Sequence, residues 1–159
     1  TLPFAVLAWR RPKWRTFGII PWALVFLAFG IFIASVSPDE RRLYVTDTSA
    51  SHDPAGNHHL RVFDVLPGNR LGNGRVFAVV APGLPDGFRV DEHGRLYVSA
   101  EDGIHVFDAD GTLLGKILVP ERTGNCAWGG ADRATLYIAA STSLYRIHLD
   151  THGATRPHA

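Results

Sequence analysis

The sequence predicts an all-β fold built from β-propeller blades. Three observations lead to this prediction: one pattern recurs along the chain, its segments alternate apolar with polar residues, and no helical period appears after residue 37. With 159 residues and 46% hydrophobic composition, the chain can form one ordinary domain with a sizeable core. The net charge is only +1 and no basic stripe follows residue 17, so we expect no nucleic-acid binding.

The first part of the chain differs from the remainder. A basic cluster at residues 10–15 precedes an uncharged apolar run over residues 17–36. A helix over this run, rising 1.5 Å per residue, would cross a hydrocarbon core of about 30 Å. The basic cluster would stay in the cytoplasm and place the following residues outside. We therefore treat residues 1–36 as a separate segment with a helical apolar part, for which a membrane anchor is one hypothesis.

Two other interpretations of residues 1–36 stay open. The segment is also compatible with a cleaved signal peptide, because the small residues 34–37 resemble a processing site. Alternatively, it is the translated junction of a truncated or frame-shifted gene. If the apolar run is no genuine membrane segment, we expect a soluble protein of the cytoplasm or periplasm.

The repeated pattern occupies residues 37–151. An acidic turn that leads into a strand recurs as SPDERRLYVTDTS, VDEHGRLYVSAED and GADRATLYIAAST, with cores that begin at Leu43, Leu96 and Leu136. A second strand-like segment follows each of them: LRVFDVL, IHVFDADG and LYRIHLDTHG. Their alternation and their β-branched and aromatic residues are typical of half-buried strands.

A unit of about 40 residues with four short antiparallel strands is typical of a propeller blade. The clearest unit comprises the strands GFRVD, RLYVSA, GIHVFD and LLGKILV. The chain encodes about three such units, whereas propellers normally close with four to eight blades. We therefore expect either another chain that closes the propeller or a larger protein to which this part belongs. Residues 152–159 are assigned to a tail.

These motifs resemble the family of senescence marker protein (regucalcin) and gluconolactonases. The resemblance covers roughly residues 36–150 and includes the phrases SPDERRLYVTDTS, PGLPDGFRVDEHGRLYVSAEDGIHVFDADGTLLGKI and NCAWGGADRATLYIAASTSLYRI. It implies a six-bladed propeller that binds a divalent cation, Ca²⁺ or Zn²⁺, in its central channel and hydrolyses sugar lactones or related esters. Of the family's metal ligands, it implies only Asp86 of the Pro-Asp-Gly motif here, because no asparagine precedes residue 37 and the other ligands fall in an absent half.

The residues leave two interpretations of Asp86 open. Pro-Asp-Gly is a common tight turn, so the carboxylate has a structural role without any ligand. As a functional group, Asp86 would hold the metal and act as general base towards a water molecule. Asp47 and Asn125 are weaker candidates for substrate binding, and their structural alternatives are a turn cap and a hydrogen bond to the backbone.

The predicted function is metal-dependent hydrolysis of a sugar lactone or related ester, impaired in this truncated chain. The alternative is a non-catalytic propeller fragment, membrane-tethered or not, that acts as a binding module or is a gene remnant. The single cysteine, Cys126, has small and apolar neighbours, which favours packing in the core over nucleophilic catalysis.

Overall fold

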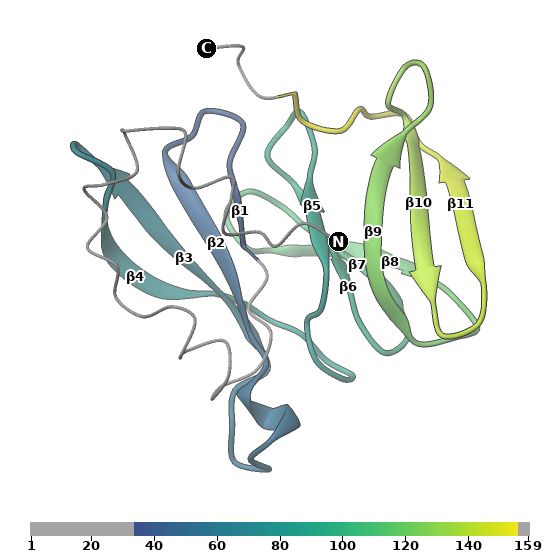
Figure 1. The fold of residues 1–159 in the computed structure, drawn as a ribbon, viewed down its shortest axis with the longest axis horizontal. Coiled ribbons are helices and arrows are strands. Elements are labelled where there is room, and N and C mark those ends of the chain that lie inside the picture. Colours follow the sequence, from purple (N-terminus) through teal and green to yellow (C-terminus); the bar gives the residue numbers. More distant parts are fainter. Residues whose placement is uncertain (1–33, 156–159) are drawn as a thin grey trace, which may run out of the picture.

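The described part of the protein forms three antiparallel sheets, each of which follows the order of the chain (Figure 1). The computed structural model describes residues 34–155. The first sheet contains β1 (Ala34–Val36), β2 (Arg42–Asp47), β3 (His59–Leu66) and β4 (Arg70–Val79). The second contains β5 (Phe88–Val90), β6 (Leu96–Ser99), β7 (Gly103–Phe107) and β8 (Leu113–Leu118). The third contains β9 (Thr123–Gly129), β10 (Thr135–Ala140) and β11 (Leu144–His148).

The strands form where the sequence alternates, and aspartates close several of the turns between them. Asp91 accepts hydrogen bonds from the backbone of the turn between β5 and β6, and Asp132 does the same before β10. Asp108 accepts a hydrogen bond from Ala109 N after β7. These side chains hold the chain reversals that antiparallel neighbours need. The three aspartates therefore have a structural role in the turns.

Two hydrophobic clusters stack the sheets against one another. The first lies between the first and second sheets and includes Tyr44, Leu60, Phe88 and Val98. The second joins the second and third sheets through Tyr97, Ile104, Cys126, Leu136 and Ile138. Figure 1 shows β1, β5 and β9 toward the middle, with β4 and β11 at the outer sides. Sheets stacked in this way, each with its first strand innermost, are arranged as propeller blades, and the prediction of an all-β fold is confirmed for the described residues.

The helix expected for the apolar run up to residue 36 is wrong for its last three residues. Ala34–Val36 form strand β1, which pairs antiparallel with β2, so that Ala34 lies opposite Val45 and Val36 opposite Leu43. An apolar run does not by itself distinguish a buried strand from a helix, and here the partner strand decides. The helical segment expected over residues 1–33 lies outside the described residues. Within residues 34–155, no helix has the length and apolar character to span a membrane.

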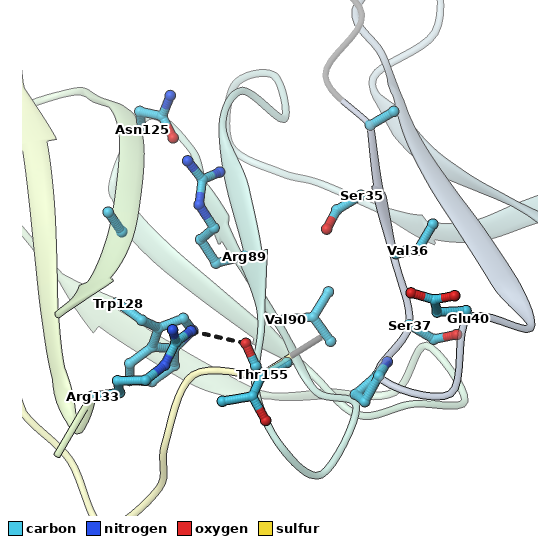
Figure 2. Close-up of a pocket in the computed structure, with 14 residues that line it drawn as sticks. Ser35, Val36, Ser37, Glu40, Arg89, Val90, Asn125, Trp128, Arg133 and Thr155 are labelled. Carbon is cyan, nitrogen blue, oxygen red and sulfur yellow. Dashed lines mark hydrogen bonds between the residues drawn. The ribbon is translucent and has the colours of Figure 1, made fainter. Parts of the chain in front are cut away.

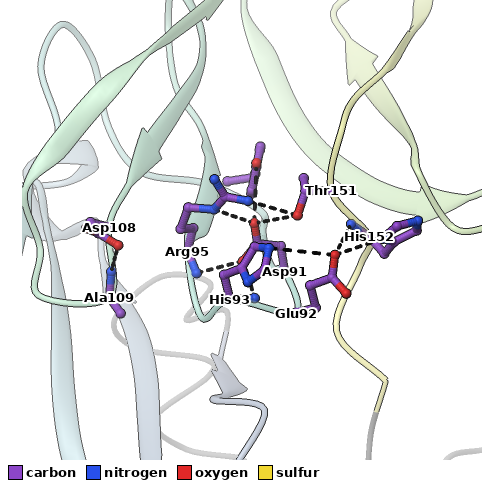
Figure 3. A network of polar contacts seen from close by, with 9 residues as sticks. Asp91, Glu92, His93, Arg95, Asp108, Ala109, Thr151 and His152 are labelled. Carbon is purple, nitrogen blue, oxygen red and sulfur yellow. Dashed lines mark hydrogen bonds and ion pairs between the residues drawn. The ribbon is translucent and has the colours of Figure 1, made fainter.

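The chain after β11 returns to the second sheet. Asp91 and Gly153 form an antiparallel bridge, and Glu92 N donates to His152 O over 2.9 Å. Figure 3 shows the polar contacts of this junction, in which Asp91 and Arg95 face Thr151. Residues 152–155, assigned to a tail from the sequence, therefore run along the turn between β5 and β6.

Candidate functional site

Three backbone hydrogen bonds fix the Pro-Asp-Gly motif at the beginning of β5. Asp86 N donates to Ser99 O over 3.0 Å, and Ser99 N donates to Gly87 O over 2.9 Å. On the other side, Gly87 N donates to Gly124 O of β9 over 2.9 Å. The motif is thus held between the end of β6 and the innermost strand of the third sheet. Asp86 lies where the two innermost strands β5 and β9 begin.

The packing at Gly87 brings Asn125 close to Asp86. A Cβ atom built on Gly87 would lie 2.8 Å from Asn125 Cα and would overlap the Asn125 side-chain amide. A Cβ built on Gly124 would lie 3.7 Å from Asp86 Oδ2. Gly87 therefore provides the space that the Asn125 side chain occupies, and Asp86 lies at ordinary contact distance from Gly124. A depression of about 410 Å³ forms there, lined by Asp86, Arg122, Thr123, Gly124, Asn125, Ala139, Ala140 and Ser141.

The surroundings of Asp86 make its carboxyl group a stronger base than usual. Partial burial raises the pKa of Asp86, while the Gly87 N–H and the nearby charge of Arg122 oppose this shift. The side chain is nevertheless exposed at the mouth of the depression, so that water reaches it. A carboxylate with a raised pKa, open to water, suits the role of a general base.

Asn125 presents a hydrogen-bond donor at the same place. Its Oδ1 accepts a hydrogen bond from Cys126 N over 2.9 Å. The side-chain oxygen is therefore hydrogen-bonded to the backbone, which is the structural role that the sequence left open for Asn125. The Nδ2 end remains available for a ligand. Asn125 can therefore accept the backbone hydrogen bond and donate to a ligand at the same time.

Asp47, the third residue predicted from the sequence, does not line this depression. It lies at the end of β2, where its carboxylate accepts hydrogen bonds from Ser49 N over 3.2 Å and Asn57 Nδ2 over 3.0 Å. Burial opposes ionisation of Asp47, but these hydrogen bonds outweigh it and keep its pKa below the usual range. Its contacts are those of a turn-capping residue, and its role in substrate binding stays a prediction.

A second cavity of about 560 Å³ lies between the innermost strands of all three sheets (Figure 2). Asn125 lines this cavity as well as the depression at Asp86, so the two are neighbours. The other polar residues that line the cavity of about 560 Å³ include Ser35 and Glu40 from the first sheet, Arg89 from β5, and Arg133. Sequence reasoning missed Arg89. The signal was present, because a lone arginine stands between the apolar Phe88 and Val90 in a strand with period two.

The described residues around Asp86 can be compared with the ligands that a metal ion needs. Asp86 offers a carboxylate, and the oxygen of Asn125 already accepts one backbone hydrogen bond, which leaves it one lone pair. Residues 34–155 contain no group of three or more histidine, cysteine, aspartate or glutamate side chains that could hold a metal ion. Calcium takes six to eight oxygen ligands and zinc usually four ligands. The donor set present does not fit a complete site for either ion.

Comparison with known proteins identifies a family for most of the chain. Residues 34–142 match the model of the SMP-30/gluconolactonase/LRE-like region. A gluconolactonase of Zymomonas mobilis is 35% identical over 125 residues, which are 75% of this chain and 35% of that protein. A pentonolactonase of Haloferax volcanii is 34% identical and covers 65% of this chain and 35% of its own length. The chain thus spans about a third of the length of these relatives.

Solved structures agree with this assignment. A gluconolactonase from Xanthomonas campestris superposes with a TM-score of 0.65 at 38% identity, over 73% of this chain and 36% of that chain. A calcium-binding regucalcin from Agrobacterium tumefaciens superposes with a TM-score of 0.64 at 21% identity, over 80% of this chain and 48% of that chain. The second likeness concerns the fold alone.

Proposed function

Because the chain belongs to the SMP-30/gluconolactonase/LRE-like family, we propose that it provides the general base of a hydrolase for sugar lactones or related esters. The observation that carries this proposal is the meeting of Asp86 and Asn125 in one depression where β5 and β9 begin. The relatives named above are lactonases, which supports the choice of substrate.

In the proposed reaction, the Asp86 carboxylate accepts a proton from a water molecule as the water oxygen attacks the lactone carbonyl carbon. The bond between this carbon and the ring oxygen then breaks, and the protonated Asp86 gives its proton to the ring oxygen, which becomes a hydroxyl group and leaves Asp86 as a carboxylate again. The product is an open-chain sugar acid, which ionises at neutral pH. Asn125 Nδ2 donates a hydrogen bond to an oxygen of the bound substrate.

The family resemblance implies a divalent cation at Asp86. Since the described residues offer only one carboxylate there, the steps above use the chain's own groups alone. Asp86 remains the proposed protein ligand for such an ion, with the other ligands supplied from outside residues 34–155.

The test is hydrolysis of glucono-δ-lactone by the 159-residue chain, followed in a pH-stat with Ca²⁺, with Zn²⁺ and with a chelator. Asp86→Asn is expected to reduce the rate above background by about 10²-fold or more, the usual contribution of a general base. The matched control is Asp110→Asn, which removes the same charge from an exposed turn between β7 and β8 and is expected to leave the rate unchanged. A rate in Asp86→Asn equal to that of the unchanged chain contradicts the proposal.

The second candidate function is a binding module without turnover. It is favoured by the incomplete donor set around Asp86. Under this alternative, the chain binds lactone or sugar acid in the depression, as seen by chemical-shift changes of Gly124 and Asn125, while hydrolysis stays at the background rate under every ion condition.

A further inference from the structure

The alternation of β5 places Arg89 on the side of the strand that faces β9. Its neighbours Phe88 and Val90 are buried, at 0% and 5% exposure, in the cluster between the first and second sheets. Successive side chains of a strand point to opposite faces. Arg89 therefore points away from that cluster, and it lines the cavity between the innermost strands.

The charge of Arg89 has no carboxylate partner among the described residues. Its Nη1 donates to Phe88 O over 2.6 Å, which engages one of the five N–H donors of the guanidinium. Two of the other described arginines do pair with carboxylates: Arg95 contacts Asp91 at 2.7 Å, and Arg75 contacts Asp64 at 3.2 Å. Within residues 34–155, no ion pair involves Arg89. A half-buried guanidinium with free donors favours an anionic ligand.

The cavity around Arg89 suits a small polar anion. Its volume of about 560 Å³ lies in the usual range for small-molecule sites. Two arginines, Arg89 and Arg133, line it against the single carboxylate of Glu40. Figure 2 shows the Arg89 side chain extending toward Asn125, with Glu40 on the opposite wall. Arg133 donates to the carbonyl oxygens of Gly153 and Ala154, so Arg89, with one hydrogen bond of this kind, has more of its N–H donors left for a ligand.

We propose that Arg89 binds the carboxylate of the open-chain sugar acid and so discriminates this acid from the neutral lactone. Hydrolysis at Asp86 would create a carboxylate beside Asn125, which lines both the depression and the cavity of Arg89. A guanidinium binds a carboxylate through two parallel hydrogen bonds, an interaction that a neutral lactone cannot make. The choice of a sugar acid rests on the proposed function. The location of the anion site rests on Arg89 alone.

The test is binding of gluconate to the 159-residue chain by calorimetry, without added divalent ions, against glucitol, a neutral polyol of the same length. The chain is expected to bind gluconate at least about tenfold more tightly than glucitol, as one charge-assisted pair predicts. Arg89→Gln is expected to abolish this preference, and Arg89→Lys to keep part of it because the charge remains while the paired geometry is lost. Arg146→Gln removes a charge from an exposed position of β11 and is the matched control with unchanged binding.

Several outcomes overturn the inference: equal binding of gluconate and glucitol, no gluconate binding through the millimolar range, or an Arg89→Gln variant that binds gluconate like the unchanged chain. Circular dichroism tests whether each variant is folded. If Arg89→Gln does not fold, the gluconate preference of Arg89→Lys is compared with that of the unchanged chain instead. The result is independent of turnover. A chain that hydrolyses no lactone but binds gluconate through Arg89 contradicts the proposed function and leaves the anion site standing.

Discussion

Gly87 and Asn125 are in such close contact that a methyl group at Gly87 would overlap the Asn125 side-chain amide and lie 2.8 Å from its Cα. Gly87 N also donates to the carbonyl of Gly124, the residue before Asn125. The depression at Asp86 is therefore shaped by the approach of two backbones, and the absence of a side chain at Gly87 is a condition for it.

Replacing Gly87 with alanine is expected to destabilise the fold. The new methyl group meets backbone and a hydrogen-bonded amide, which cannot both move aside, and overpacking of this kind costs about 1–3 kcal/mol. The measurement is the free energy of unfolding in urea. The chemical shifts of Asn125 would also move, because β9 has to shift away from β5.

Gly115→Ala in β8 is the matched control. A Cβ atom at Gly115 would meet no atom within 4 Å, so this variant is expected to be neutral or slightly more stable, since alanine restricts the unfolded chain. Equal effects of the two substitutions would show that the close approach at Gly87 does not limit stability.

Asp86→Asn is expected to make the protein more stable at neutral pH. The pKa of Asp86 is raised in the folded state because burial disfavours its charge. Between the unfolded pKa and the raised folded pKa, the unfolded chain loses its proton first, and stability falls as the pH rises through this window. Above the window the cost of the charge is fully present, and asparagine avoids it.

The melting temperature of Asp86→Asn is therefore expected to exceed that of the unchanged chain by about 1–2 °C near pH 7, a small gain because the group is exposed. The difference should vanish below about pH 3, where the carboxyl group is protonated in both the folded and the unfolded state. Asp110→Asn is the opposite control, because the hydrogen bond from Thr112 N lowers the pKa of Asp110, and this variant should lose stability at neutral pH. An Asp86→Asn variant that melts at a lower temperature than the unchanged chain at pH 7, and at the same temperature at pH 3, is incompatible with this account.

Asp91→Ala is expected to cost about 3–5 kcal/mol of unfolding free energy, because it leaves a charged partner unpaired. Asp91 is fully buried and contacts Arg95 at 2.7 Å. It also accepts a hydrogen bond from Thr151 Oγ1 over 3.1 Å and thereby ties the chain after β11 to the second sheet. Urea denaturation measures the loss. The control Asp110→Ala removes an exposed turn aspartate and should cost much less than Asp91→Ala.

The sequence was sufficient for the second sheet because every level of the pattern agrees there. The strands expected from GFRVD, RLYVSA, GIHVFD and LLGKILV are β5, β6, β7 and β8. Each contains alternating or β-branched residues, and the first three strands lead into turns with glycine or aspartate, so local preference and burial point to the same structure. β1 was missed because its three residues continue an apolar run, and only their pairing with β2 distinguishes them.

In the candidate site, too, the sequence pattern does not show which side chains come into contact. Asp86 was found through a motif, but its meeting with Asn125 depends on the contact between β5 and β9, which no local pattern encodes. Asp47 resembles a channel residue in the sequence, yet Ser49 and Asn57 surround its carboxylate in the structure. The partner of a polar side chain is a property of the tertiary structure, and sequence spacing alone leaves several choices open.

The 159-residue chain is expected to bind Ca²⁺ only weakly, with a dissociation constant above about 1 mM. One carboxylate and no cluster of further acidic or histidine ligands are present in residues 34–155 at Asp86. The sequence of residues 1–33 contains no acidic residue that could add a charged ligand. Calorimetry with Ca²⁺ measures this directly, and Asp86→Asn serves as the reference. Micromolar binding that disappears in Asp86→Asn would reveal ligands beyond those described.

Cys126 is expected to react with thiol reagents only when the protein opens. It is the single cysteine of the chain and is 3% exposed, and its Sγ donates to Tyr97 O over 3.4 Å. Burial raises the pKa of Cys126 to about 11, so the reactive thiolate is only about 10⁻³ of the population near pH 8. Labelling with a chromogenic disulfide should therefore be slow in buffer and become complete within the mixing time in unfolding concentrations of urea. The same experiment on Gly87→Ala should show faster labelling without urea, because a displaced β9 carries Cys126 with it. Rapid labelling of the unchanged, folded chain would instead mean that the third sheet opens readily, and the hydrophobic cluster around Cys126 would then be no barrier to the reagent.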